Sequence, residues 1–175
     1  GGEPVEIEPL TDAGIVDFPS PIGDAPAIYT LHSELLTFGK SFGCSECSFQ
    51  LSLGPAVLER LKSLIGSSPE EIALAAAEAE KPSAQTVSFH LIDAYKGDRH
   101  VRVACKTSPV ERWGLGGSVV STAAPAAAAV RMMAHGTLDA VGALPPEECV
   151  EADALFAELE TRGAEFKVTE YESQG

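Results

Sequence analysis

The chain has 175 residues, slightly more than the roughly 150 of an average domain, so a single compact domain over residues 1–175 is expected. Its 12 lysine and arginine residues are outnumbered by 26 aspartate and glutamate residues, and the net charge of -14 disfavours binding to nucleic acid or to anionic membranes. No apolar run approaches the ~20 residues of a membrane span, and the acidic N-terminal segment differs from a secretory signal, so a cytoplasmic location is predicted.

The first half of the chain predicts short strands followed by two helices. Prolines recur through the first 30 residues and limit that segment to extended pieces, which we place at 5–8, 14–18 and 27–33. Alternation of apolar and polar residues over 47–53 predicts another strand. Apolar spacing from 57 to 65 predicts a helix. Ser68, Pro69 and the two glutamates that follow predict the start of a second helix, which runs to about residue 80.

The second half predicts a hairpin, two helices and a final strand. Two alternating runs flank Lys96-Gly97-Asp98 and predict an antiparallel hairpin over 84–107. A glycine-rich loop precedes an alanine-rich helix at 121–136, a further helix covers about 150–162, and a strand covers 164–171. Because strands are grouped rather than alternating with helices, the sequence predicts an α+β fold with a mixed, largely antiparallel sheet and helices on one face.

The densest polar cluster lies at the end of the strand predicted at 27–33. On an extended strand, Thr30, His32 and Glu34 project from one face. An imidazole beside a carboxylate can bind a substrate amine or exchange a proton with it, with Glu34 fixing the tautomer of His32. The alternative is a strand end whose polar groups only satisfy the backbone of the adjoining loop.

Two further groups of polar residues have a functional and a structural interpretation. Arg112 beside Trp113 predicts either a guanidinium clamp for a carboxylate or a surface arginine that lies along the indole. The hairpin face opposite the aliphatic one is either a solvated sheet face or a surface for a substrate or partner. The residues expected on it are Ser88, His90, His100, Arg102 and Lys106.

Neither the cysteines nor the glycine-rich loop predicts a bound cofactor. Cys44 and Cys47 have the spacing of a zinc or redox motif, but no second ligand pair stands near either of the other two cysteines, so no metal site is predicted. The loop over 114–117 lacks the third glycine of a dinucleotide fingerprint and is expected to be a flexible loop. The chain alone is therefore expected to bind neither NAD nor NADP.

Three segments resemble, in the same order, the C-terminal, non-Rossmann part of the saccharopine dehydrogenase-like oxidoreductases. This family includes saccharopine reductases, carboxynorspermidine dehydrogenases and lysine dehydrogenases. The segments are VDFPSPIGDAPAIYTLHSELLTF (16–38), STAAPAAAAVRMMAHGTLDAVGALPPEE (121–148) and DALFAELETRGAEFKV (153–168). The resemblance implies a fold similar to the C-terminal domain of glyceraldehyde-3-phosphate dehydrogenase, with one sheet face turned toward the nicotinamide.

The resemblance also implies a function. The chain would be the substrate-binding and dimerisation domain of an NAD(P)-dependent oxidoreductase that acts on a C–N bond of an amino acid or polyamine-like substrate. The cofactor, NAD or NADP, would belong to the full-length protein, because the family's upstream Rossmann domain is absent from this sequence. The expected catalytic residues are His32 and Glu34, and the expected substrate-binding residues are Thr30, Ser33, Arg112 and Trp113. The alternative is a non-catalytic module that binds a partner protein with an open sheet face.

Overall fold

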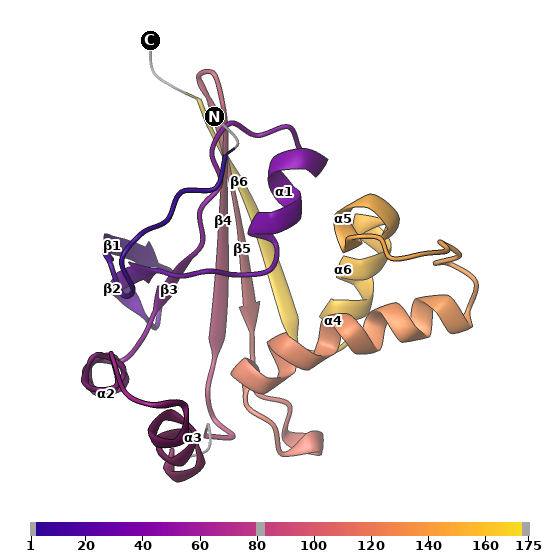
Figure 1. Cartoon of the computed structure of the whole chain (residues 1–175). Coiled ribbons are helices and arrows are strands. Elements are labelled where there is room, and N and C mark those ends of the chain that lie inside the picture. Colours follow the sequence, from indigo (N-terminus) through magenta and orange to yellow (C-terminus); the bar gives the residue numbers. More distant parts are fainter. Residues whose placement is uncertain (1–2, 80–82, 173–175) are drawn as a thin grey trace. The chain divides into compact units, whose positions relative to one another are not determined.

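The computed structural model describes residues 3–79 and 83–172, and the chain divides into two compact units, Gly1–Glu80 and Lys81–Gly175. Each unit contains one three-stranded sheet together with helices (Figure 1). Every strand pair in both sheets is antiparallel. The predicted α+β class and antiparallel pairing are thus confirmed, with the strands distributed over two small sheets.

The first unit is built around strand β2 (Gly23–Tyr29), which pairs with β1 (Asp12–Phe18) on one side and with β3 (Gln50–Ser52) on the other. Successive residues of a strand point to opposite faces, and Ala27 and Ile28, near the C-terminal end of β2, are both buried. The central strand therefore supplies the core of this unit.

Three helices complete the first unit: α1 (Leu35–Ser41), α2 (Pro55–Ser63) and α3 (Pro69–Glu78). The predicted start of α3 is confirmed as a capping box. The Ser68 hydroxyl accepts a hydrogen bond from the Glu71 N–H at 3.2 Å, and the Glu71 carboxylate accepts one from the Ser68 N–H at 2.8 Å. Helix α1 was not predicted, because the polar run before it was assigned to a strand.

The second unit is built on the predicted hairpin. Strands β4 (Ser88–Lys96) and β5 (Arg99–Thr107) are joined by a two-residue turn, and Gly97 adopts a φ of 61° that a side chain would disfavour. Strand β6 (Ala164–Glu172) pairs with the other side of β5 over nine residues. The predicted hairpin and the predicted last strand are thus confirmed.

Helix α4 (Gly117–Ala134) packs against this sheet and against α6 (Ala152–Glu160), and two short helices, η1 (Glu111–Trp113) and α5 (Pro146–Cys149), lie in the connections. One stripe of α4 is buried, with residues three and four apart as expected for a helix face. It consists of Gly117, Val120, Ala124, Ala128 and Met132.

Helix α4 begins four residues before the predicted start, since the glycine-rich loop runs directly into it. The carbonyl oxygen of Thr86, just before β4, accepts a hydrogen bond from the Gly117 N–H at 2.6 Å. The Thr86 hydroxyl lies 3.0 Å from the Ser118 hydroxyl. A Cβ on Gly117 would lie 2.1 Å from the carbonyl oxygen of Thr107. The glycine is therefore required by the close approach of the helix to the sheet, and the loop has a packing role.

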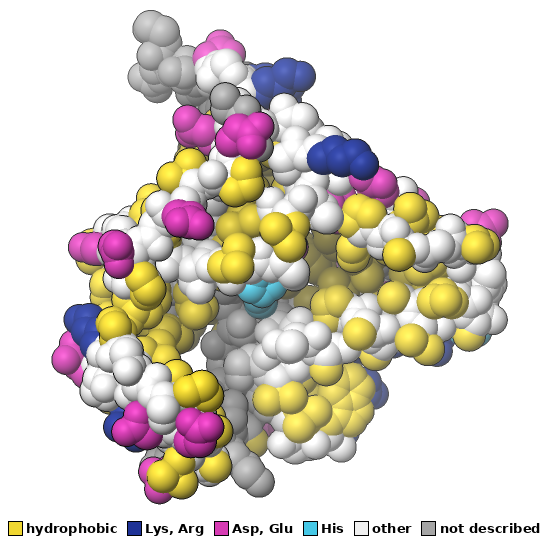
Figure 2. Space-filling view, viewed as in Figure 1, with side chains coloured by type: hydrophobic (Ala, Val, Ile, Leu, Met, Phe, Trp, Pro, Cys, Tyr) yellow, Lys and Arg dark blue, Asp and Glu magenta, His cyan; other side chains and the backbone are white. Residues whose placement is uncertain are grey.

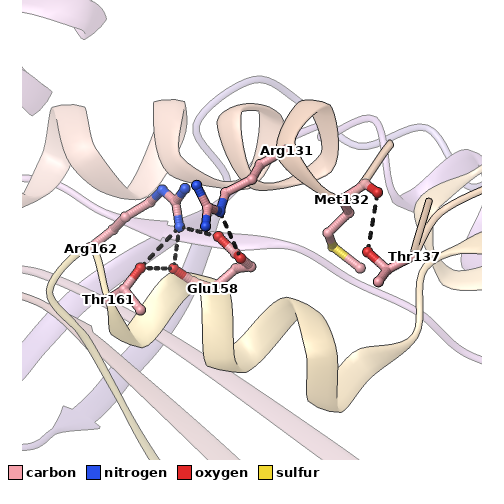
Figure 3. A network of polar contacts seen from close by, with 6 residues as sticks. All are labelled: Arg131, Met132, Thr137, Glu158, Thr161 and Arg162. Carbon is pink, nitrogen blue, oxygen red and sulfur yellow. Dashed lines mark hydrogen bonds and ion pairs between the residues drawn. The ribbon is translucent and has the colours of Figure 1, made fainter. Parts of the chain in front are cut away.

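A polar network ties α4 to α6 (Figure 3). Glu158 accepts hydrogen bonds from Arg131 at 3.1 Å and from Arg162 at 2.7 Å, one to each carboxylate oxygen. The hydrogen bond from Arg162, supported by Arg131, lowers the pKa of the Glu158 carboxyl against the opposing effect of burial. The two arginines thus hold one carboxylate between the helices.

Candidate functional site

The predicted catalytic residues lie in the loop between β2 and α1. His32 Nδ1 contacts Glu34 Oε2, and the Ser33 hydroxyl lies 3.2 Å from the same oxygen. The His32 ring stacks on Phe49, with ring centroids 4.4 Å apart and an angle of 16° between the planes. About half of the surface of each of the His32 and Glu34 side chains is exposed, at 47% and 42%. The pair is held in place and open to solvent.

The structure corrects how these residues come together. Strand β2 ends at Tyr29, so Thr30, His32 and Glu34 do not share a strand face. Thr30 still donates its N–H to the Phe49 carbonyl at 3.2 Å, after which the chain turns, and Glu34 is the N-cap residue of α1. The turn that starts the helix, rather than the period of a strand, brings the imidazole and the carboxylate into contact.

This arrangement is suited to proton transfer. A carboxylate at Nδ1 favours the tautomer that carries its proton there, so Nε2 keeps a lone pair. The stacking on Phe49 restricts the orientation of the ring. An oriented imidazole open to solvent can accept a proton from a bound amine and return it.

Arg112 and Trp113 lie in the second unit, within η1. The guanidinium carbon of Arg112 is 4.8 Å from the centroid of the Trp113 ring, a cation–π contact on a half-exposed indole. The structural interpretation, an arginine that lies along the indole, describes this geometry. The donors of a planar guanidinium still point outward from its edge, so the contact leaves Arg112 suited to a carboxylate.

A second polar cluster lies on one face of the sheet β4–β5–β6; His100 and Arg102 were predicted on a polar face of the hairpin, but their partners Asp93, Tyr95 and Tyr171 were not. His100 is stacked between two tyrosine rings, with centroids at 4.3 Å for Tyr95 and 4.6 Å for Tyr171. Its Nε2 lies 2.6 Å from Asp93 Oδ1. Arg102 completes the cluster with two hydrogen bonds to the Asp93 carboxylate, at 2.8 and 3.0 Å.

The strand register explains why these residues meet. With a two-residue turn, Lys96 pairs with Arg99, which places Asp93 opposite Arg102 and Tyr95 opposite His100. Counting residue pairs outward from a two-residue turn would have predicted the contacts among Asp93, Arg102, Tyr95 and His100. The pairing of Tyr171 with His100 depends on the last strand of the chain and has no local signal.

The register also corrects the predicted faces of the hairpin. His100, Arg102 and Lys106 lie opposite the valines of β5, as predicted. Ser88 and His90 pair with Thr107 and Cys105 and therefore lie on the valine face, where the prediction was wrong. The error came from the uncertain length of the turn, because a shift of one residue exchanges the two faces of a strand.

Arg102 and His100 determine the ionisation of Asp93. Burial alone would raise the pKa of this carboxyl, but the hydrogen bonds and charges of Arg102 and His100 outweigh it and lower the pKa. The same pairing with Asp93 raises the pKa of Arg102. The cluster is thus a satisfied ion pair that holds an imidazole at the sheet surface.

Asp93→Asn is expected to destabilise the second unit by about 2 kcal/mol at pH 7, because it weakens hydrogen bonds to a charged group. A lowered pKa stabilises the fold above the pKa of the unfolded carboxyl, and this contribution is lost as the pH falls through the folded pKa. The difference in free energy of unfolding between wild type and variant, measured with urea, should therefore become smaller at acidic pH. The control is Glu170→Gln, whose partner Arg99 is 3.8 Å away and exposed, with an expected change below about 0.5 kcal/mol.

Comparison of the chain with models of known protein families and with curated proteins finds no match. Among the described residues, none of the helices combines the length and the apolar character needed to cross a lipid bilayer.

Proposed function

We propose that the chain is the substrate-binding and dimerisation domain of an NAD(P)-dependent oxidoreductase that acts on a C–N bond of an amino acid or polyamine-like substrate. The observation that carries this proposal is the solvent-exposed contact of His32 with Glu34. It lies inside the segment 16–38 that resembles the saccharopine dehydrogenase-like family. An oxidation or reduction at a C–N bond needs a group that exchanges a proton with the nitrogen, and this pair has that chemistry.

The remaining predicted residues have roles of binding in the proposal. Thr30 and Ser33 flank His32 and offer hydroxyl groups to a polar substrate. Arg112, supported by Trp113, would bind the carboxylate of an amino acid.

The nicotinamide cofactor would supply the redox chemistry. The glycine-rich loop of this chain does not fit its pyrophosphate, since Thr86 already accepts the Gly117 N–H at the start of α4. We therefore assign the cofactor to the Rossmann domain of the proposed enzyme, and this chain's own residues bind and orient the substrate.

The outer face of α4 supports the dimerisation part of the proposal. Figure 2 shows hydrophobic side chains gathered along this helix. Small or apolar exposed residues recur at helical spacing along α4: Ala123, Ala126, Ala127, Val130 and Met133. The alternative function, a non-catalytic module that binds a partner protein with an open sheet face, would use a sheet rather than this helix and would leave His32 without a role.

A titration followed by NMR separates the two functions. We expect L-lysine, L-glutamate or spermidine to shift the signals of His32 saturably, and the amino acids to shift those of Arg112 as well, because both side chains contact the substrate in the proposal. His32→Ala should remove the response at Arg112 only in part, and Arg112→Ala should weaken binding of the amino acids more than that of spermidine, which has no carboxylate. Absence of a saturable shift with all three compounds would contradict the proposed enzymatic function.

A further inference from the structure

A pocket of about 220 Å³ lies between the first sheet and helix α2. The sheet contributes Pro26 and Ile28 of β2 and Leu51 of β3, which lie on one face because residues two apart in a strand share a side. The helix contributes Leu58 and Lys62, which are four residues apart and so share one face of α2. At roughly 30 Å³ per water molecule, this space holds about seven waters or one small organic molecule.

One wall of the pocket is formed by a residue in an unfavourable backbone conformation. Leu10 has a φ of 61°, the one positive value at a non-glycine residue of the described chain. It follows Pro9 in a turn in which Thr11 N–H donates to the Glu8 carbonyl at 3.3 Å. Glycine is the usual residue at such a position, and a bulky side chain there is strained. Leu10 is one of the residues that line the pocket, so a strained backbone position lies at its wall.

Two opposite charges line this otherwise apolar pocket, Asp12 of β1 and Lys62 of α2. The Lys62 ammonium contacts Glu59 at 3.0 Å in an exposed pair, which is weak and easily exchanged for a ligand. The Asp12 carboxylate accepts the Gly14 N–H at 2.8 Å on one oxygen, and a carboxylate has capacity for further hydrogen bonds. The pocket thus offers one cationic and one anionic group beside an apolar surface.

We propose that this pocket binds a small zwitterionic α-amino acid with an apolar side chain. Its carboxylate pairs with Lys62, its ammonium group pairs with Asp12, and its side chain lies against Leu10, Ile28, Leu51 and Leu58. This site goes beyond the proposed function, because it uses none of the residues assigned to the reaction. An amino acid held there acts as a second ligand of the chain.

The test uses L-leucine as the probe and the methyl signals of Ile28 and Leu51 as the readout. We expect saturable shifts with L-leucine, and much weaker binding of 4-methylpentanoate, which lacks the ammonium group, and of isopentylamine, which lacks the carboxylate. Lys62→Met keeps the aliphatic stem and Asp12→Asn keeps an acceptor for Gly14. Each should weaken L-leucine binding at least about tenfold, as expected for loss of a charged hydrogen bond.

Matched controls lie in the same unit. Lys40→Met removes an exposed lysine from α1, and Asp17→Asn removes an exposed aspartate from β1. Both should bind L-leucine as the wild type does. The proposal is overturned if L-leucine gives no saturable shift at these methyl groups, or if each variant behaves like its control. Its failure is distinguishable from failure of the proposed function, whose readout is at His32 and Arg112.

Discussion

Gly117→Ala is expected to destabilise the second unit by about 3 kcal/mol or more, because its new methyl group meets backbone rather than flexible side chains. The added Cβ would lie 2.1 Å from the Thr107 carbonyl oxygen and 2.9 Å from that of Thr86. To remove this clash, α4 would have to move away from the hairpin. That movement would also break the 2.6 Å hydrogen bond from the Gly117 N–H to the Thr86 carbonyl oxygen.

Urea unfolding followed by the fluorescence of Trp113, the single tryptophan of the chain, measures this loss in the unit concerned. Gly39→Ala is the control for a helix glycine with free space, since no atom lies within 4 Å of its Cβ position and it is inside helix α1. Because Gly39 lies in the first unit, the unfolding of this variant is followed by circular dichroism. There alanine should be neutral or stabilising by up to about 1 kcal/mol. A Gly117→Ala protein as stable as wild type would show that α4 does not pack on the hairpin through this residue.

His32→Ala, made in the oxidoreductase that we propose contains this chain, is expected to lower kcat about 100-fold, which is typical for the loss of an acid–base group. Stability should change little, because about half of the side chain is exposed. Arg112→Ala should mainly raise KM by removing a binding contact. Steady-state kinetics with thermal unfolding of each variant separates these effects.

The control for this substitution is His135→Ala, which removes an exposed histidine at the C-terminal end of α4. Its kcat should equal that of the wild type. Normal turnover in a folded His32→Ala enzyme would refute the catalytic role. A large drop in the melting temperature would instead indicate that the stacking of His32 on Phe49 serves to hold the loop in place.

The parts of the fold that the sequence predicted well depend on neighbouring residues. The capping box of Ser68 and Glu71 and the turn at Gly97 each involve contacts a few residues apart, so their signals are complete within a short window. The final strand was predicted because its alternation is regular and Gly163 was expected to end the helix before it; Gly163 has a φ of 92° in the structure.

The parts that it missed depend on distant residues. Nothing near Tyr29 indicates that β2 stops there, because its partner β3 is only three residues long and lies more than 20 residues ahead. The candidate site follows the same rule. The pairing of His32 with Glu34 is local and was anticipated, whereas the stacking of Tyr171 on His100 joins strands 71 residues apart along the chain (171 − 100).

The nine-residue strands of the second sheet have a consequence for solubility. In the described part of the chain β4 and β6 form the two edges of that sheet, and an edge strand can pair with the backbone of another molecule. Charged side chains, Glu165, Lys167 and Glu170, are exposed along β6, and the net charge of -14 makes two copies of the chain repel each other. Salt screens this repulsion, so the tendency of the chain to self-associate through β6 grows with ionic strength.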